Sequence, residues 1–147
     1  IEKHVPSARV VADNIAALGL KERTTLLTTS AFLWSKRDLP TKAVGLRIPE
    51  VEEKDDFAIR DPQLAIPWLV FCSPPYTFYV DRRDAMCELV ASIMQHAPPG
   101  SIVIAEADDR FDFDFLPGGV QKEKHGPGWD VRTYPPAVVG VWRGKQI

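Results

Sequence analysis

Cysteine, histidine and methionine are scarce in this chain of 147 residues, and long apolar runs are absent from it. Cys72 and Cys87 have neither the spacing of a metal site nor the density of a disulfide framework, so we expect a reducing, cytoplasmic location. His4, His96 and His125 lack the spacing of metal ligands, so we expect no metal site. No stretch reaches the roughly 18 apolar residues of a membrane span, so we expect no membrane partner.

The chain also lacks an excess of charge of one sign. Its 18 basic and 20 acidic residues give a net charge of -2, which provides no general attraction to nucleic acid or acidic membranes. A local basic face could still bind RNA, although exposed basic residues are common on any protein surface. The candidates for such a face are Lys36, Arg37, Arg82, Arg83, Lys122 and Lys124. The length suits a single domain, residues 1–147, which we expect to be monomeric.

Segments with helical and with β-type patterns alternate along the chain, which predicts an α/β fold. Apolar spacing predicts one amphipathic helix before Gly19, which would cap it, and a second over residues 82–97. Short apolar or β-branched runs predict strands, of which the last two would form an antiparallel hairpin at the sheet edge. These strands cover residues 24–28, 65–72, 102–106, 129–134 and 137–142.

Three segments carry further expectations. Residues 65–72 are almost continuously apolar, which predicts a strand buried on both faces in a parallel sheet. Residues 35–63 are charged and interrupted by proline, which predicts a long surface connection. Residues 108–115 interleave aspartate with phenylalanine, which could indicate a cation-binding loop or a strand exit with two different faces.

The tetrapeptide Ser73-Pro74-Pro75-Tyr76 directly follows the apolar strand. Two adjacent prolines cannot continue a central strand or a helix, so the strand must end in a rigid turn. Ligands bind at the carboxyl ends of strands in open α/β sheets. The turn could therefore present the Tyr76 ring to a flat base, or it could be a plain turn whose tyrosine packs on the next helix.

The segment LVFCSPPY, residues 69–76, resembles the [D/N/S]-P-P-[Y/F/W] motif of methyltransferases that act on exocyclic amines of adenine, cytosine or guanine. Further segments are similar, in the same order, to RsmD-type enzymes, which methylate guanine N2 of small-subunit ribosomal RNA. These segments are Glu2, residues 14–20 (NIAALGL), Ser30-Ala31, residues 99–106 (PGSIVIAE) and Val141-Trp142-Arg143. The resemblance implies a Rossmann-like class I methyltransferase sheet with a C-terminal antiparallel hairpin.

This resemblance implies an enzyme that uses S-adenosylmethionine, with ribosomal RNA or an assembled small ribosomal subunit as its partner. The Ser73 side chain and the Pro74 carbonyl would accept hydrogen bonds from the guanine amine, on a turn that Pro75 helps to keep rigid. Tyr76 would stack on the extruded base. The other residues that we expect to bind substrate are Phe78, Arg82 and Arg83.

The resemblance also implies the residues that bind the cofactor. Glu2 would hold the ribose hydroxyls, Ser30 and Ala31 would lie near the adenine, and Ser73 would border the cofactor from the other side. Taken by itself, Glu2 is better explained as a solvated terminal charge, and Ser30 could equally be the N-cap of a helix.

Three features depart from the family pattern. Ser73 stands where Asp or Asn is usual, and Ser30 stands where an acidic residue is expected. An acidic residue such as Glu2 normally follows a glycine loop by about 20 residues, so we expect a partial domain that lacks the first strand and this loop. Two alternatives therefore stay open: a non-catalytic RNA-binding or assembly module derived from the fold, or an amino-methyltransferase that acts on DNA or another substrate.

Overall fold

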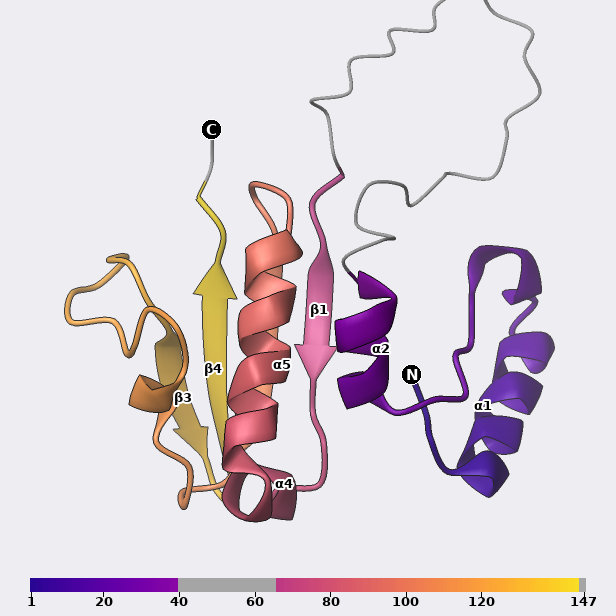
Figure 1. Ribbon diagram of the computed structural model, residues 1–147. Helices are drawn as coiled ribbons and strands as arrows, with labels where there is room; N and C mark the ends of the chain where they lie inside the picture. The colour runs from indigo at the N-terminus through magenta and orange to yellow at the C-terminus, as the bar shows by residue number, and fades with distance from the viewer. Residues whose placement is uncertain (40–65, 146–147) are drawn as a thin grey trace, which may run out of the picture.

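The computed structural model describes residues 1–39 and 66–145, which form a mixed α/β fold with one open sheet (Figure 1). The strand order is β1-β2-β4-β3, with β1 parallel to β2 and the other pairs antiparallel. The strands are β1 (Leu69–Cys72), β2 (Ile102–Ala107), β3 (Asp130–Tyr134) and β4 (Ala137–Arg143). The α-helices are α1 (Val5–Ala17), α2 (Ala31–Arg37), α4 (Thr77–Asp81) and α5 (Arg83–His96).

The core lies between the sheet and α5. This helix buries an apolar stripe at helical spacing, as its sequence predicted: Met86, Leu89, Val90 and Ile93. On the sheet, Val103 and Ala105 of β2 are fully buried. Alternate residues of a strand face opposite sides, so this buried set defines the face of the sheet that α5 covers.

The expectation that residues 65–72 form a strand buried on both faces was wrong. Strand β1 covers only Leu69–Cys72 and has β2 as its one neighbour in the part of the sheet that the structure describes. Val70 and Cys72 pack against the core, whereas Leu69 and Phe71 are 61% and 70% exposed. Helix α5 packs against one face of this edge strand, and the apolar side chains of the second face therefore border the cavity described below.

The predicted strand at residues 24–28 is also absent, although all of these residues are described. Thr24 is extended, with φ -135° and ψ 134°, as its β-branched side chain favours. The backbone contact of this segment is a hydrogen bond from the Glu2 N–H to the Leu27 carbonyl, at 3.0 Å. A strand needs a ladder of such bonds along a neighbour, which local sequence preference cannot supply.

The remaining predicted elements are confirmed where the structure describes them. Helix α1 ends before Gly19, which has φ +65° and donates its N–H to the Ala16 carbonyl at 3.0 Å. Strands β3 and β4 form the closing hairpin, and β3 is the edge strand farthest from β1. Helix α2 occupies the start of the expected connection at residues 35–63, and residues 40–63 lie outside the described part of the chain.

The segment that follows β2 has two different faces. Phe111 and Phe113 are buried, whereas Asp112 and Asp114 are exposed and accept backbone N–H groups of this segment. This supports a strand exit rather than a cation loop, and residues 1–39 and 66–145 contain no cluster of three or more metal-binding side chains. Over the same residues, no helix is both long enough and apolar enough to cross a membrane.

Candidate functional site

The parallel pairing of β1 and β2 brings two distant polar residues together. Cys72 lies opposite Ala105 in the register, so the residues that follow them, Ser73 and Glu106, are neighbours at the carboxyl ends of the strands. The Ser73 hydroxyl donates to Oε2 of Glu106 at 2.8 Å, and the Tyr76 hydroxyl donates to Oε1 at 2.6 Å. One carboxylate therefore holds both polar side chains of the Ser-Pro-Pro-Tyr turn.

The two prolines of the turn lead directly into α4. The Phe78 N–H donates to the Pro75 carbonyl at 2.9 Å, and the Tyr79 N–H donates to the Tyr76 carbonyl at 3.1 Å. Tyr79 is fully buried beneath the turn and directs its hydroxyl at the Cys72 carbonyl, 3.4 Å away. Because the turn is fixed by proline and by this anchor, its exposed groups are held in place before any ligand binds.

Hydrogen bonding within this cluster changes the acidity of its members. The bonds from Tyr76 and then from Ser73 lower the pKa of Glu106, because they stabilise its charged form. The same bond to Glu106 is the largest cause that raises the pKa of Tyr76, and partial burial and the charges of Glu106 and Asp108 add to it. At neutral pH, the cluster thus contains a carboxylate that accepts from two protonated hydroxyls.

The pKa of Tyr76 provides a direct test of this cluster. We expect its phenol to ionise above the ordinary value of about 10, and Glu106→Gln to return the pKa towards that value because the negative acceptor is lost. The measurement is the phenolate absorbance as a function of pH, with the titration of Tyr76→Phe subtracted. An unchanged titration in Glu106→Gln would contradict the hydrogen bond.

The pKa shifts of Glu106 and Tyr76 determine the pH range in which the cluster stabilises the fold. Since the pKa of Glu106 is lowered, its contribution is complete above about pH 4.3 and disappears as the pH falls through the lowered value. Since the pKa of Tyr76 is raised, its contribution is complete below about pH 10 and disappears as the pH rises through the raised value.

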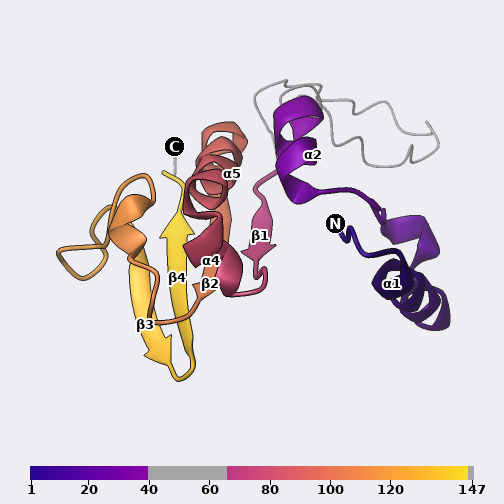
Figure 2. The same ribbon diagram turned by 60° about the horizontal axis from the view of Figure 1, so that its bottom comes forward.

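A cavity of about 1010 Å³ lies at the edge of β1 away from β2, where all four residues of this strand and the inner side of α5 line it. The N-terminal segment and α2 border it on the side of β1 that is away from β2 (Figures 1 and 2). Its lining contains most of the residues that the sequence predicted for the site: Glu2, Ser30, Ala31, Ser73, Pro74, Pro75, Phe78 and Arg82. Tyr76 and Arg83 are not among the lining residues.

One wall of the cavity is aromatic and cationic. The rings of Phe32 and Phe78 stack with their centroids 6.1 Å apart. The Arg82 guanidinium lies 4.3 Å from the Phe32 centroid and 5.4 Å from the Phe78 centroid. Such a layer can attract an anionic or flat ligand. The sequence predicted Phe78 and Arg82 as site residues but not Phe32, although Phe32 directly follows Ser30-Ala31.

Further polar groups that line the cavity come from the N-terminal part of the chain. Oε1 of Glu2 accepts the His4 backbone N–H at 2.6 Å, which orients this carboxylate beside the start of α1. Ser30 is the N-cap residue of α2 by position, but its side chain makes no capping hydrogen bond. A large apolar cavity with a few polar groups is the usual form of a site for a small organic ligand.

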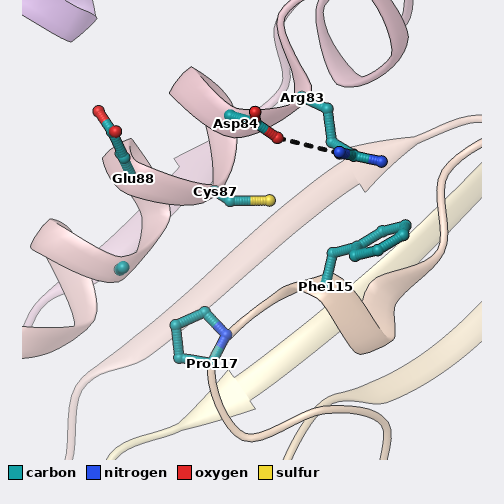
Figure 3. A pocket seen from close by; sticks show the side chains of 7 residues that line it. Arg83, Asp84, Cys87, Glu88, Phe115 and Pro117 are labelled. Atoms are coloured by element: carbon teal, nitrogen blue, oxygen red, sulfur yellow. Dashed lines mark hydrogen bonds and ion pairs between the residues drawn. The ribbon is translucent and has the colours of Figure 1, made fainter.

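Arg83 lies in a different part of the molecule from Arg82. It pairs with Asp84 at 3.1 Å and covers the Phe115 ring, 4.6 Å from the centroid, at a second hollow of about 370 Å³ (Figure 3). Among the other candidates for a basic face, Lys36 and Arg37 belong to α2, which packs against α5, whereas Lys122 and Lys124 precede β3. Lys36 pairs with Glu88 at 3.0 Å, and Lys122 lies in the connection before β3, near the sheet edge farthest from β1.

Glu106 lies at the centre of the polar cluster, although the sequence pattern predicted no role for it. The sequence did contain a signal for it, because Ser73 and Glu106 each stand at the carboxyl end of a predicted strand.

A scan against models of known protein families finds no match to this chain, and searches of curated proteins and of solved structures find none.

Proposed function

We propose that this chain is a Rossmann-like class I methyltransferase domain that transfers a methyl group from S-adenosylmethionine to the exocyclic N2 amine of a guanine in small-subunit ribosomal RNA. The observation that carries the proposal is the shared cavity. The turn of Ser73, Pro74 and Pro75 lines the same space as Glu2 and Ser30, which lie far away in the sequence.

The cavity is compatible with such a cofactor in size and in the groups that it offers. Its volume of about 1010 Å³ is at the upper end of the roughly 300–1,000 Å³ typical of small-molecule sites. The Glu2 carboxylate is a suitable acceptor for ribose hydroxyls, and Phe32 and Trp34 offer apolar surface to an adenine ring. When bound, S-adenosylmethionine supplies an electrophilic methyl group on a positively charged sulfur.

The residues of the turn would position the methyl acceptor. The Ser73 hydroxyl oxygen and the Pro74 carbonyl accept hydrogen bonds from the amine and thereby orient its nitrogen. The Tyr76 ring stacks on the extruded base and thereby holds the plane of the base against the turn. Because the turn is rigid in the free protein, little conformational entropy is lost when the base binds.

Calorimetric titration with S-adenosylmethionine and S-adenosylhomocysteine tests the proposal. We expect micromolar binding of both, and an affinity at least about 10-fold weaker in Glu2→Ala, since a charged hydrogen-bond acceptor is removed. Glu22→Ala is the matched control, because this residue lies in the turn at Lys21–Arg23, outside the cavity lining. No binding by the intact chain, or equal losses in the two variants, would contradict the proposal.

A non-catalytic RNA-binding or assembly module is the second candidate. None of the strand-to-helix connections in residues 66–145 contains glycine, so this part of the chain offers no glycine loop for a cofactor. RNA binding without cofactor binding would favour this candidate.

An amino-methyltransferase for DNA would instead bind DNA better than structured RNA at matched salt. For the methyltransferase of ribosomal RNA and for the assembly module alike, we expect a monomeric, cytoplasmic protein with a ribosomal partner.

A further inference from the structure

The Ser73 hydroxyl has a single proton, and its hydrogen bond to Glu106 uses that proton. Its oxygen donates to Oε2 of Glu106 at 2.8 Å, on the same carboxylate that accepts from Tyr76 at 2.6 Å. A hydroxyl has one donor and two acceptor positions. While Ser73 donates to Glu106, it can therefore only accept a hydrogen bond from any further partner.

We propose that Glu106 is a positioning residue that fixes Ser73 as a hydrogen-bond acceptor and thereby makes the turn selective for a base with an exocyclic amine. The inference rests on the proposed function, because it concerns the amine that the turn would bind. It explains how serine can take the position where Asp or Asn is usual. The carboxylate of Glu106 in β2 supplies the negative charge, and it acts on the ligand through the hydroxyl of Ser73.

The strand pairing makes Glu106 suitable for this role. Glu106 lies opposite Val139 of β4 in the antiparallel register, and the preceding residue, Ala105, pairs with Cys72 of β1, so both neighbouring strands determine where Glu106 lies. Both carboxylate oxygens are engaged by hydroxyls of the turn. A hydroxyl that donates to a charged acceptor is polarised, which strengthens the hydrogen bond that it accepts in turn.

The selectivity follows from the direction of this bond. A guanine N2 amine donates, so it is matched to an oxygen that only accepts. A base without that amine leaves the Ser73 oxygen unpaired in the complex, which costs affinity. If Glu106 were removed, the serine proton could turn towards the ligand, and the preference for the amine would be lost.

The test compares two short single-stranded RNAs that are identical except for one position, guanosine in the first and inosine in the second. Inosine lacks the N2 amine, and binding is measured by fluorescence anisotropy without cofactor, so that methyl transfer does not enter. We expect the 147-residue chain to prefer guanosine about 2- to 10-fold, as one hydrogen bond to a neutral group would give. Glu106→Ala and Ser73→Ala should each bring the ratio to about 1.

A double-mutant cycle shows whether Glu106 acts through Ser73. Combining Glu106→Ala with Ser73→Ala should change the ratio no further than Ser73→Ala alone. Glu106→Asp keeps both acceptor oxygens on a shorter side chain and should restore part of the preference. Asp109→Asn, an exposed carboxylate three residues further along, is the matched loss of charge and should leave the ratio unchanged.

The two possible failures are distinguishable. If the intact chain prefers guanosine and Glu106→Ala keeps that preference, the role of Glu106 is overturned while the proposed function stands. If the intact chain binds both RNAs equally, or neither, the proposed recognition of the amine fails, and the role of Glu106 fails with it.

Discussion

Replacing Tyr76 with alanine is expected to weaken RNA binding about 5- to 150-fold, because the stack of an aromatic side chain on a base contributes about 1–3 kcal/mol. The affinity for S-adenosylmethionine should stay nearly unchanged, since Tyr76 is not among the residues that line the cavity. Parallel titrations of the variant with RNA and with the cofactor measure the two effects.

Two control variants separate the ring from other contributions. Tyr76→Phe keeps the stacking surface and loses only the hydrogen bond to Glu106, so it should retain most of the RNA affinity. Tyr134→Ala removes an exposed ring of β3, at the sheet edge farthest from β1, and should have no effect on binding. If Tyr76→Ala weakened cofactor binding instead of RNA binding, the stacking role of this ring would be wrong.

Replacing Trp129 with alanine is expected to lower the free energy of unfolding by about 3–5 kcal/mol, as is typical when a buried tryptophan is truncated. Trp129 is fully buried, its indole N–H donates to the Pro117 carbonyl at 3.1 Å, and its ring lies 6.1 Å from that of Phe113. The loss is a large part of the about 5–15 kcal/mol that stabilises a typical domain. Urea unfolding of the variant and the parent chain measures it.

Trp129→Phe is the matched control for packing. It keeps most of the apolar volume and loses the hydrogen bond to Pro117, so its loss of stability should be clearly smaller than that of the alanine variant. A loss below about 1 kcal/mol in Trp129→Ala would show that this side chain does not organise the core as its burial indicates.

The sequence by itself determined the features that depend on near neighbours along the chain. The apolar spacing in residues 82–97 predicted the buried stripe of α5, and Gly19 predicted the end of α1. The two short β-type runs near the C-terminus predicted the hairpin of β3 and β4. Adjacent prolines fixed the turn after β1 because their rings restrict the backbone wherever they stand.

The sequence shows that Arg82 and Arg83 are adjacent along the chain. It does not show that their side chains lie at two different sites. Arg82 is the N-cap of α5, with the non-helical angles φ -132° and ψ 33°, whereas Arg83 is the first residue of the helix, so their side chains leave the backbone in different directions. Arg82 consequently stacks on Phe32 at the large cavity, whereas Arg83 covers Phe115 at the smaller hollow. Which of these side chains meets a ligand depends on the surfaces that pack around the helix.

Only the tertiary structure decided which strands have neighbours and which distant side chains meet. Residues 24–28 have the preference for a strand but no ladder partner, and Leu69 and Phe71 of β1 are exposed because they lie on the face of the strand that is turned away from the core. The register of β1 on β2 joins Glu106 to Ser73, 33 positions away in the sequence. Periodicity gives the face that a side chain occupies, whereas the partner on that face is set by which strands pair and in which register.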